Sequence, residues 1–221
     1  MTKFNAIHFD MDGVIANTEP LHVAAEQQTC RDYNFAISPD QWGGFKGQTA
    51  DAIFTYLLNN YGDPERQTVE QLIDHKTNLF LEMTSSRLEP IDGALDFLNW
   101  AHDTYEKVTL VTSSNRRVQQ RIISQFGITH LFDNIITGDD ISNGKPHPEP
   151  YLLSLEQTNS LAERSIIIED SKSGIQSALA AKCAVLAIAT SHSPSELVSA
   201  NPTFIASNFQ DARLQLSERS F

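Results

Sequence analysis

Short apolar runs alternate with helix-like segments over most of the 221-residue chain. The apolar runs are rich in β-branched residues and lie at 6–9, 108–111, 134–136, 165–168, 184–188 and 203–205. Their shortness and composition are typical of strands buried in a parallel sheet. The helix-like segments between them lie at 94–103, 116–126, 148–157 and 174–181. This alternation predicts an α/β fold with a doubly wound, Rossmann-like parallel sheet as its core.

One interval interrupts the alternation. Residues 10–107 separate the first two predicted strands and contain no convincing strand, although they are far too many for a simple loop. Apolar positions recur there at helical spacing, with proline and glycine at the joins. They predict helices at 21–33, 49–60 and 69–84. We therefore expect an inserted all-α helical-bundle cap, residues 17–89, in a catalytic core formed by residues 1–16 and 90–221.

Composition narrows the class of protein. The chain has 16 basic and 28 acidic side chains and a formal net charge of -12, which argues against a nucleic-acid partner. Its apolar stretches are too short to cross a bilayer, and the N-terminus has no apolar signal segment. Two cysteines, Cys30 and Cys183, form no disulfide framework. We expect a cytoplasmic protein, a monomer with no membrane partner.

The first candidate for chemistry is the acidic pair Asp10 and Asp12, which follows the first predicted strand and precedes Gly13. Alternate residues of an extended segment project to the same side, so both carboxylates can face one pocket beyond the strand. Such a pair suits divided labour, in which one group attacks and the other transfers a proton. The alternative is a solvated turn or a helix cap.

Hydroxyl groups follow the second predicted strand, at Thr112, Ser113 and Ser114, and Asn115 comes next. Hydroxyls and free amides at the start of a helix can bind an anion. An ordinary helix cap is the competing interpretation for the same residues.

A lysine and a second acidic pair occur further along the chain. Lys145 lies between a glycine and a proline and would suit a phosphate group, or it is an exposed turn lysine. Glu169 and Asp170 end a hydrophobic run and could complete a Mg²⁺ site with Asp10, or they are acids at a helix start. Acid, hydroxyl, lysine and acid thus follow successive strands in one order, and that joint pattern is specific.

In these positions the chain resembles the haloacid dehalogenase superfamily of phosphotransferases. The superfamily's four signatures match, in order, residues 10–14 (DMDGV), Thr112, Lys145 and residues 169–171 (EDS). The helical insert is similar to the cap of the subfamily with phosphoglycolate phosphatases, sugar phosphatases and beta-phosphoglucomutase. Residues 17–22 and 144–151 are typical of the beta-phosphoglucomutase-like branch.

The resemblance implies a role for each matched residue. Asp10 would be the nucleophile that forms an aspartyl-phosphate, and Asp12 would protonate the leaving oxygen and then activate water. Thr112 and the Ser113 amide would hold phosphoryl oxygens, while Lys145 would neutralise charge and orient Asp10. These roles agree with what phosphoryl transfer requires, which is positioning and charge neutralisation.

The resemblance also implies a cofactor and contacts to a substrate. Mg²⁺ would bind the Asp10 carboxylate, the Asp12 carbonyl and Asp170, with Glu169 acting through water or behind the ligands. Substrate contacts would come from His22, Lys46, Ser113, Ser114 and Asn115. For Lys46, an ordinary surface lysine is an equally strong interpretation.

The predicted function is a Mg²⁺-dependent phosphomonoesterase for a small phosphorylated metabolite, a sugar phosphate in particular. A hexose-phosphate mutase of the beta-phosphoglucomutase type is the alternative. The mutases carry an arginine soon after the Lys-Gly pair of the cap, but here Lys46 and Gly47 are followed by Gln48, Thr49 and Ala50. Loss of that arginine favours hydrolysis. Many relatives also have Asp where this chain has Asn17.

Two further classes compete with an enzyme. A phosphoacceptor signalling domain also uses Asp, Thr or Ser, and Lys around Mg²⁺, but such domains are shorter, lack the helical insert and order these residues differently. The second class is a binding protein that has the same fold but no catalytic activity. The intact set of signature residues argues against it.

Overall fold

The computed structural model describes residues 4–43, 45 and 50–217. The chain divides into two compact units. The core comprises Met1–Asn17 and Glu89–Phe221, and the cap comprises Thr18–Leu88. The expected boundaries, after residues 16 and 89, each differ from this division by one residue.

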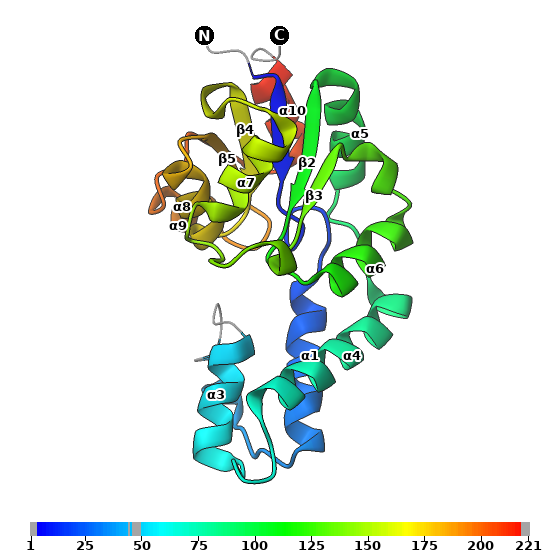
Figure 1. The fold of residues 1–221 in the computed structure, drawn as a ribbon, viewed down its shortest axis with the longest axis vertical. Helices are drawn as coiled ribbons and strands as arrows, with labels where there is room; N and C mark the ends of the chain where they lie inside the picture. Colours follow the sequence, from blue (N-terminus) through cyan, green and yellow to red (C-terminus); the bar gives the residue numbers. More distant parts are fainter. Residues whose placement is uncertain (1–3, 44, 46–49, 218–221) are drawn as a thin grey trace. The chain divides into compact units, whose positions relative to one another are not determined.

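The core is built on a parallel sheet of six strands in the order β3-β2-β1-β4-β5-β6 (Figure 1). The strands are β1 Ala6–Phe9, β2 Lys107–Val111, β3 Asn134–Ile136, β4 Ser165–Glu169, β5 Ala184–Ile188 and β6 Phe204–Ala206. Their register places Phe9, the last residue of β1, beside Leu110 of β2 and Ile168 of β4, so β2 and β4 end one residue beyond β1. The predicted doubly wound α/β fold is confirmed.

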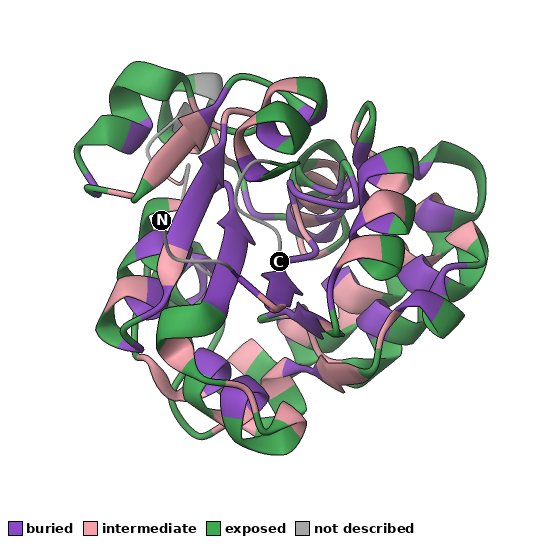
Figure 2. Ribbon diagram, turned by 90° about the horizontal axis from the view of Figure 1, so that it is seen from above, coloured by how far each residue is buried: buried purple, intermediate pink, exposed green. Residues whose placement is uncertain are grey.

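Helices cover both faces of the sheet. In the core they are α5 Ala94–Thr104, α6 Arg116–Phe126, α7 Glu149–Thr158, α8 Lys172–Ala180, α9 Pro194–Val198 and α10 Phe209–Ser217. On one face, α7, α8 and α9 bury apolar residues such as Tyr151, Ile175 and Leu197. On the other, Phe97 of α5 packs against Phe9 and Phe209. The central strands are therefore buried, as their purple colour in Figure 2 shows.

The structure corrects the start of one expected helix and adds three helices that were not expected. The helix expected from residue 174 begins at Lys172, because the Ser171 side chain accepts a hydrogen bond from the Gly174 amide and caps the helix earlier. Helices α2 (Pro39–Gly43), α9 and α10 were not predicted from the hydrophobic pattern. Two of these three have only five residues, too few for helical periodicity to show.

A tight loop follows β1 and leads out of the core. The Gly13 and Ile15 amides donate to the carbonyls of Ala16 and Met11, at 2.8 and 2.9 Å. The outgoing segment Ile15–Asn17 then pairs with the returning segment Glu89–Ile91 through an antiparallel bridge. The Ile91 amide donates to the Ile15 carbonyl, and the Asn17 amide to the Glu89 carbonyl, each at 2.9 Å. We call these paired segments the neck.

The cap is a small helical bundle with its own apolar core. Its helices are α1 Glu19–Asp32, α2 Pro39–Gly43, α3 Ala50–Tyr61 and α4 Val69–Arg87. The residues at its centre are Cys30, Phe35, Ile53, Phe54, Leu57, Leu58 and Leu72, with Trp42 and Phe45 packed against them. Helix α4 begins with a capping box formed by Thr68 and Gln71. Among the described residues, no helix combines the length and the apolar character that crossing a membrane requires.

Candidate active site

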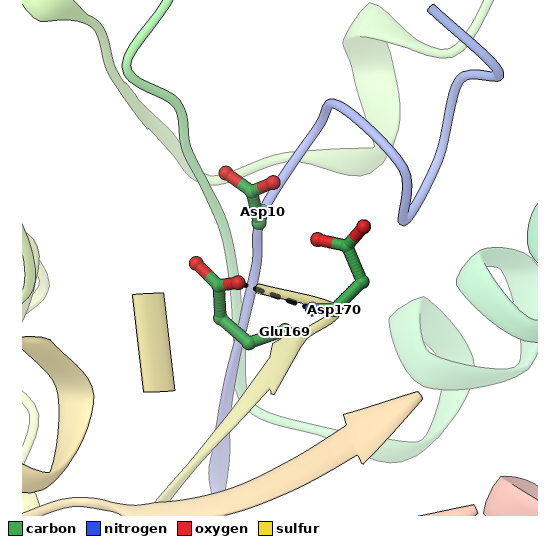
Figure 3. Close-up of side chains that lie close together, drawn as sticks. All are labelled: Asp10, Glu169 and Asp170. Atoms are coloured by element: carbon green, nitrogen blue, oxygen red, sulfur yellow. Dashed lines mark hydrogen bonds between the residues drawn. The ribbon is translucent and has the colours of Figure 1, made fainter. Parts of the chain in front are cut away.

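Three buried carboxylates meet at the carboxyl edge of the sheet (Figure 3). Asp10 follows β1, Glu169 is the last residue of β4, and Asp170 comes directly after it. Because β1 and β4 are neighbouring parallel strands, their ends meet at one edge. One oxygen from each acid lies within 4.8 Å of the others.

Lys145 lies against two of these acids. Its ammonium group donates to Asp10 Oδ1 at 2.6 Å, to Glu169 Oε1 at 2.7 Å and to the Val111 carbonyl at 3.1 Å. Burial works to lower the pKa of Lys145, but the charges of Asp10 and Glu169 outweigh it and raise the pKa well above 10.5. The lysine is therefore a fixed positive charge beside Asp10.

Glu169 holds this lysine from a fully enclosed position. Its Oε1 accepts from Lys145 and, at 2.9 Å, from the Tyr151 hydroxyl. Its Oε2 accepts from the Asp170 and Ser171 amides, both at 3.1 Å, and from the Ser171 hydroxyl at 3.0 Å. These donors occupy both oxygens, so the arrangement suits a role behind the metal ligands.

Two glycines make room for the acids. A Cβ on Gly174 would lie 1.7 Å from Glu169 Oε1 and 2.2 Å from Oε2. A Cβ on Gly13 would lie 2.0 Å from Asp170 Oδ2, and its φ of +80° lies in the region that favours glycine. Any side chain at either position would displace a carboxylate of the site.

If all three acids were ionised, they would carry more negative charge than Lys145 offsets. Burial raises the pKa of Asp10 well above 3.8, against the opposing effect of Lys145. Burial, and then the charge of Glu169, raise the pKa of Asp170 to about 7, although a hydrogen bond from Ser191 lowers it. A divalent cation would relieve this excess of negative charge.

The residues present fit Mg²⁺, which prefers a few carboxylate oxygens and completes its shell with water and phosphate. Asp10 and Asp170 are the side chains that would hold it, since Glu169 is occupied by its hydrogen-bond donors. The Asp12 backbone carbonyl stays a predicted third ligand.

The hydroxyls after β2 bind the second aspartate. Asp12 Oδ2 accepts from Thr112 Oγ1 at 3.2 Å and from Ser114 Oγ at 3.0 Å. Thr112 Oγ1 in turn accepts from the Ser114 amide at 3.0 Å. The structure thus brings Asp12 together with Thr112 and Ser114, which lie 100 and 102 residues further along the chain.

The other two residues of this segment are Ser113 and Asn115. Asn115 Oδ1 accepts from the Val118 amide at 2.9 Å and caps α6, as its competing interpretation proposed. Ser113 is exposed, and its carbonyl approaches Gly138. Their predicted contacts with substrate stay predictions.

A family model identifies the group to which the chain belongs. The model of the haloacid dehalogenase-like hydrolases matches residues 7–188, more than half of the chain. The chain is a haloacid dehalogenase-like hydrolase. The resemblance inferred from the four signatures is thereby confirmed, and the protein belongs to a class of enzymes.

Similar proteins include two phosphatases and one solved structure. A phosphorylated carbohydrates phosphatase of Thermotoga maritima is 30% identical over 80% of this chain and 81% of its own length. A phosphoglycolate phosphatase of Vibrio cholerae is 27% identical over 93% and 94%, respectively. A solved structure of a candidate beta-phosphoglucomutase from Thermotoga maritima has a TM-score of 0.81 and 26% identity, with 97% of this chain and 99% of that chain covered.

Two residues of the cap, His22 and Lys46, are predicted to contact the substrate. His22 stacks on Phe80, with ring centroids 4.3 Å apart, and its Nδ1 lies 2.8 Å from Lys76 Nζ. Lys46 lies outside the described residues.

Sequence reasoning missed several residues of the hydrolase's site. His192 had no predicted role in the site, yet its Nδ1 donates to the Asp170 carbonyl at 3.1 Å. Tyr151, which supports Glu169, and Ser191, which bonds Asp170, also had no predicted role. The end of the predicted strand at residue 188 was the available signal, since parallel strands place the segments that follow them at one edge.

Proposed function

We propose that this hydrolase is a Mg²⁺-dependent phosphatase that acts on a small phosphorylated metabolite through an aspartyl-phosphate on Asp10. The observation that carries the proposal is the Lys145 ammonium held between Asp10 and Glu169, next to Asp170. This arrangement orients a buried carboxylate and gathers positive charge where phosphoryl oxygens would lie.

In the first half of the reaction, an Asp10 oxygen attacks phosphorus while the bond to the ester oxygen breaks. Lys145 binds Oδ1, so Oδ2 is the attacking atom in this proposal. Asp12, protonated, gives its proton to the leaving oxygen, which departs as an alcohol. A bound divalent cation would supply charge neutralisation for Asp10 and the phosphoryl group.

In the second half, Asp12 takes a proton from water as the water oxygen attacks phosphorus. The bond to Asp10 breaks, and orthophosphate and the free carboxylate result. The same residue therefore acts as acid and then as base, which conserves protons over the cycle.

Thr112 and Ser114 would link substrate binding to the release of Asp12. Both hydroxyl protons point to Asp12 Oδ2. A phosphoryl oxygen that binds these hydroxyls competes with Asp12 for them, and Asp12 is then free to reach the leaving group.

A sugar phosphate is the substrate class that we propose. The Thermotoga maritima relative is named for phosphorylated carbohydrates, and it is similar over most of both chains. His22 and Lys46 in the cap, with Ser113 and Asn115, are the proposed contacts to the substrate.

A hexose-phosphate mutase is the second candidate, favoured by the likeness to the candidate beta-phosphoglucomutase. Ala50 stands near the place where the mutases have an arginine for a second phosphate. A mutase must bind both ends of a bisphosphate, so the lack of that arginine favours hydrolysis.

The test is phosphate release from sugar phosphates, phosphoglycolate and nucleotides, with Mg²⁺ or EDTA. We expect release that requires metal and that falls by at least about a thousandfold in Asp10→Asn, because the nucleophile is lost. Asp103→Asn, which alters an exposed acid of α5, is the matched control and should retain full activity.

The panel includes beta-glucose 1-phosphate with a trace of bisphosphate, followed by a readout of glucose 6-phosphate. If glucose 6-phosphate forms without free phosphate, the result would support the mutase reaction instead of hydrolysis. Metal-independent release, or full activity of Asp10→Asn, would contradict both.

A further inference from the structure

The loop after β5 contacts the acidic site through three consecutive side chains. Thr190 Oγ1 donates to the Gly13 carbonyl at 2.5 Å. The Ser191 side chain lies against the Asp170 carboxylate, and its hydrogen bonding lowers the pKa of that group. The His192 Nδ1 donates to the Asp170 carbonyl at 3.1 Å. One short loop therefore holds the backbone of Gly13 and both the backbone and the side chain of Asp170.

One oxygen of the Asp170 carboxylate lies close to the Ser191 hydroxyl. A Cβ on Gly13 would lie 2.0 Å from Asp170 Oδ2 and 2.5 Å from Ser191 Oγ, so both atoms lie against the Gly13 Cα. Asp170 is 4% exposed, and its carboxylate has little room to rotate. Figure 3 shows one oxygen of Asp170 on the side that faces Asp10 and Glu169.

We propose that Ser191 is a positioning residue for the metal ligand Asp170, a statement that rests on the proposed metal-dependent function. The Ser191 hydroxyl donates to the carboxylate and fixes its rotation, so that one oxygen stays directed toward Asp10. Thr190 and His192 hold the two backbone segments between which the carboxylate lies.

The effect on metal binding follows from preorganisation. A carboxylate that is already oriented loses less conformational freedom when it binds a cation. A hydroxyl that donates to an anionic carboxylate also stabilises the charged form that a metal requires. Hydrogen-bond partners behind metal ligands contribute about 10- to 100-fold to metal affinity.

The test measures metal affinity directly, without turnover. Free Mn²⁺, an ion that suits carboxylate ligands as Mg²⁺ does, is followed by electron paramagnetic resonance during titration of the full chain, and Mg²⁺ is added as competitor. Ser191→Ala should weaken Mn²⁺ binding about 10-fold or more. Ser191→Thr, which keeps the hydroxyl, should restore affinity to within about twofold of the unaltered chain.

A matched control is Ser199→Ala. Ser199 is an exposed serine eight positions away, whose hydroxyl donates to the Glu196 carbonyl. It should leave Mn²⁺ affinity unchanged. Thermal melts of all variants separate weaker binding from loss of fold.

Equal affinity of Ser191→Ala and the unaltered chain would overturn the role of Ser191 and leave the metal-dependent function standing. Failure of the unaltered chain to bind Mn²⁺ or Mg²⁺ would overturn both. Weaker binding by Ser191→Ala with recovery in Ser191→Thr would support both.

Discussion

Glu169 connects distant parts of the core through one carboxylate. It accepts hydrogen bonds from Lys145, from Tyr151 of α7 and from Ser171 at the start of α8. Hydrogen bonds to an ionised carboxylate are stronger than those between neutral groups. Lys145 is consequently held beside Asp10 by a carboxylate that is itself fixed by α7 and by the start of α8.

Asp170 gives a prediction for the pH dependence of metal binding. Its pKa is raised to about 7, so in the metal-free protein the carboxyl keeps its proton below that pH and loses it above. A cation binds the charged form, and the proton must leave first. We expect Mn²⁺ affinity to fall as the pH decreases below about 7, by up to about tenfold per pH unit from the protonation of Asp170 alone.

Titrations of free Mn²⁺ between about pH 5.5 and 8 measure this dependence. An aspartate with the reference pKa of about 3.9 would be ionised throughout this range and would give no such dependence. Affinity that stays constant down to pH 5.5 would mean that Asp170 is already ionised there. That result would contradict the raised pKa.

At the scale of elements, the first turn of α8 is built around the Glu169 carboxylate. Gly174 lies in this turn, where alanine would ordinarily favour the helix by about 1 kcal/mol. A Cβ there would instead lie 1.7 Å from Glu169 Oε1. Gly174→Ala should therefore lower the free energy of unfolding by about 3 kcal/mol, the upper range for overpacking.

Urea unfolding measures that change, and Gly144→Ala is its control. A Cβ on Gly144 would meet no atom within 4 Å, so that substitution should alter stability by less than about 0.5 kcal/mol. A stabilised Gly174→Ala protein would show that α8 can shift away from Glu169.

The strands and most helices could be predicted because their apolar runs are local in sequence. The sequence also indicated that Asp10, Thr112, Lys145 and Asp170 follow strand ends, and the family signatures assigned their roles. Contacts such as Thr190 with Gly13 could not be predicted, because they join residues 177 positions apart. They depend on sheet order and on loop conformation, which hydrophobic periodicity does not encode.

At the scale of the whole molecule, the side chains of the proposed metal site all lie in the core. Asp10, Lys145, Glu169, Asp170 and Ser191 all belong to Met1–Asn17 or Glu89–Phe221. Replacement of Thr18–Leu88 by a short Gly-Ser turn should therefore preserve cooperative unfolding and leave Mn²⁺ affinity within about threefold. The paired neck already has the geometry that a hairpin turn can close.

Calorimetry and Mn²⁺ titration of this shortened chain test the expectation. A folded core that binds Mn²⁺ poorly would show that residues of the cap contribute to the metal site. The intact chain, measured in parallel, supplies the reference values for both quantities.

The neck has a consequence for how such a protein can change over generations. Its two segments leave and re-enter the core as hydrogen-bonded neighbours, so a gene can lose, gain or exchange the intervening stretch at two junctions and still encode the same sheet edge. Recombination at these two junctions can therefore give one core a series of different inserts.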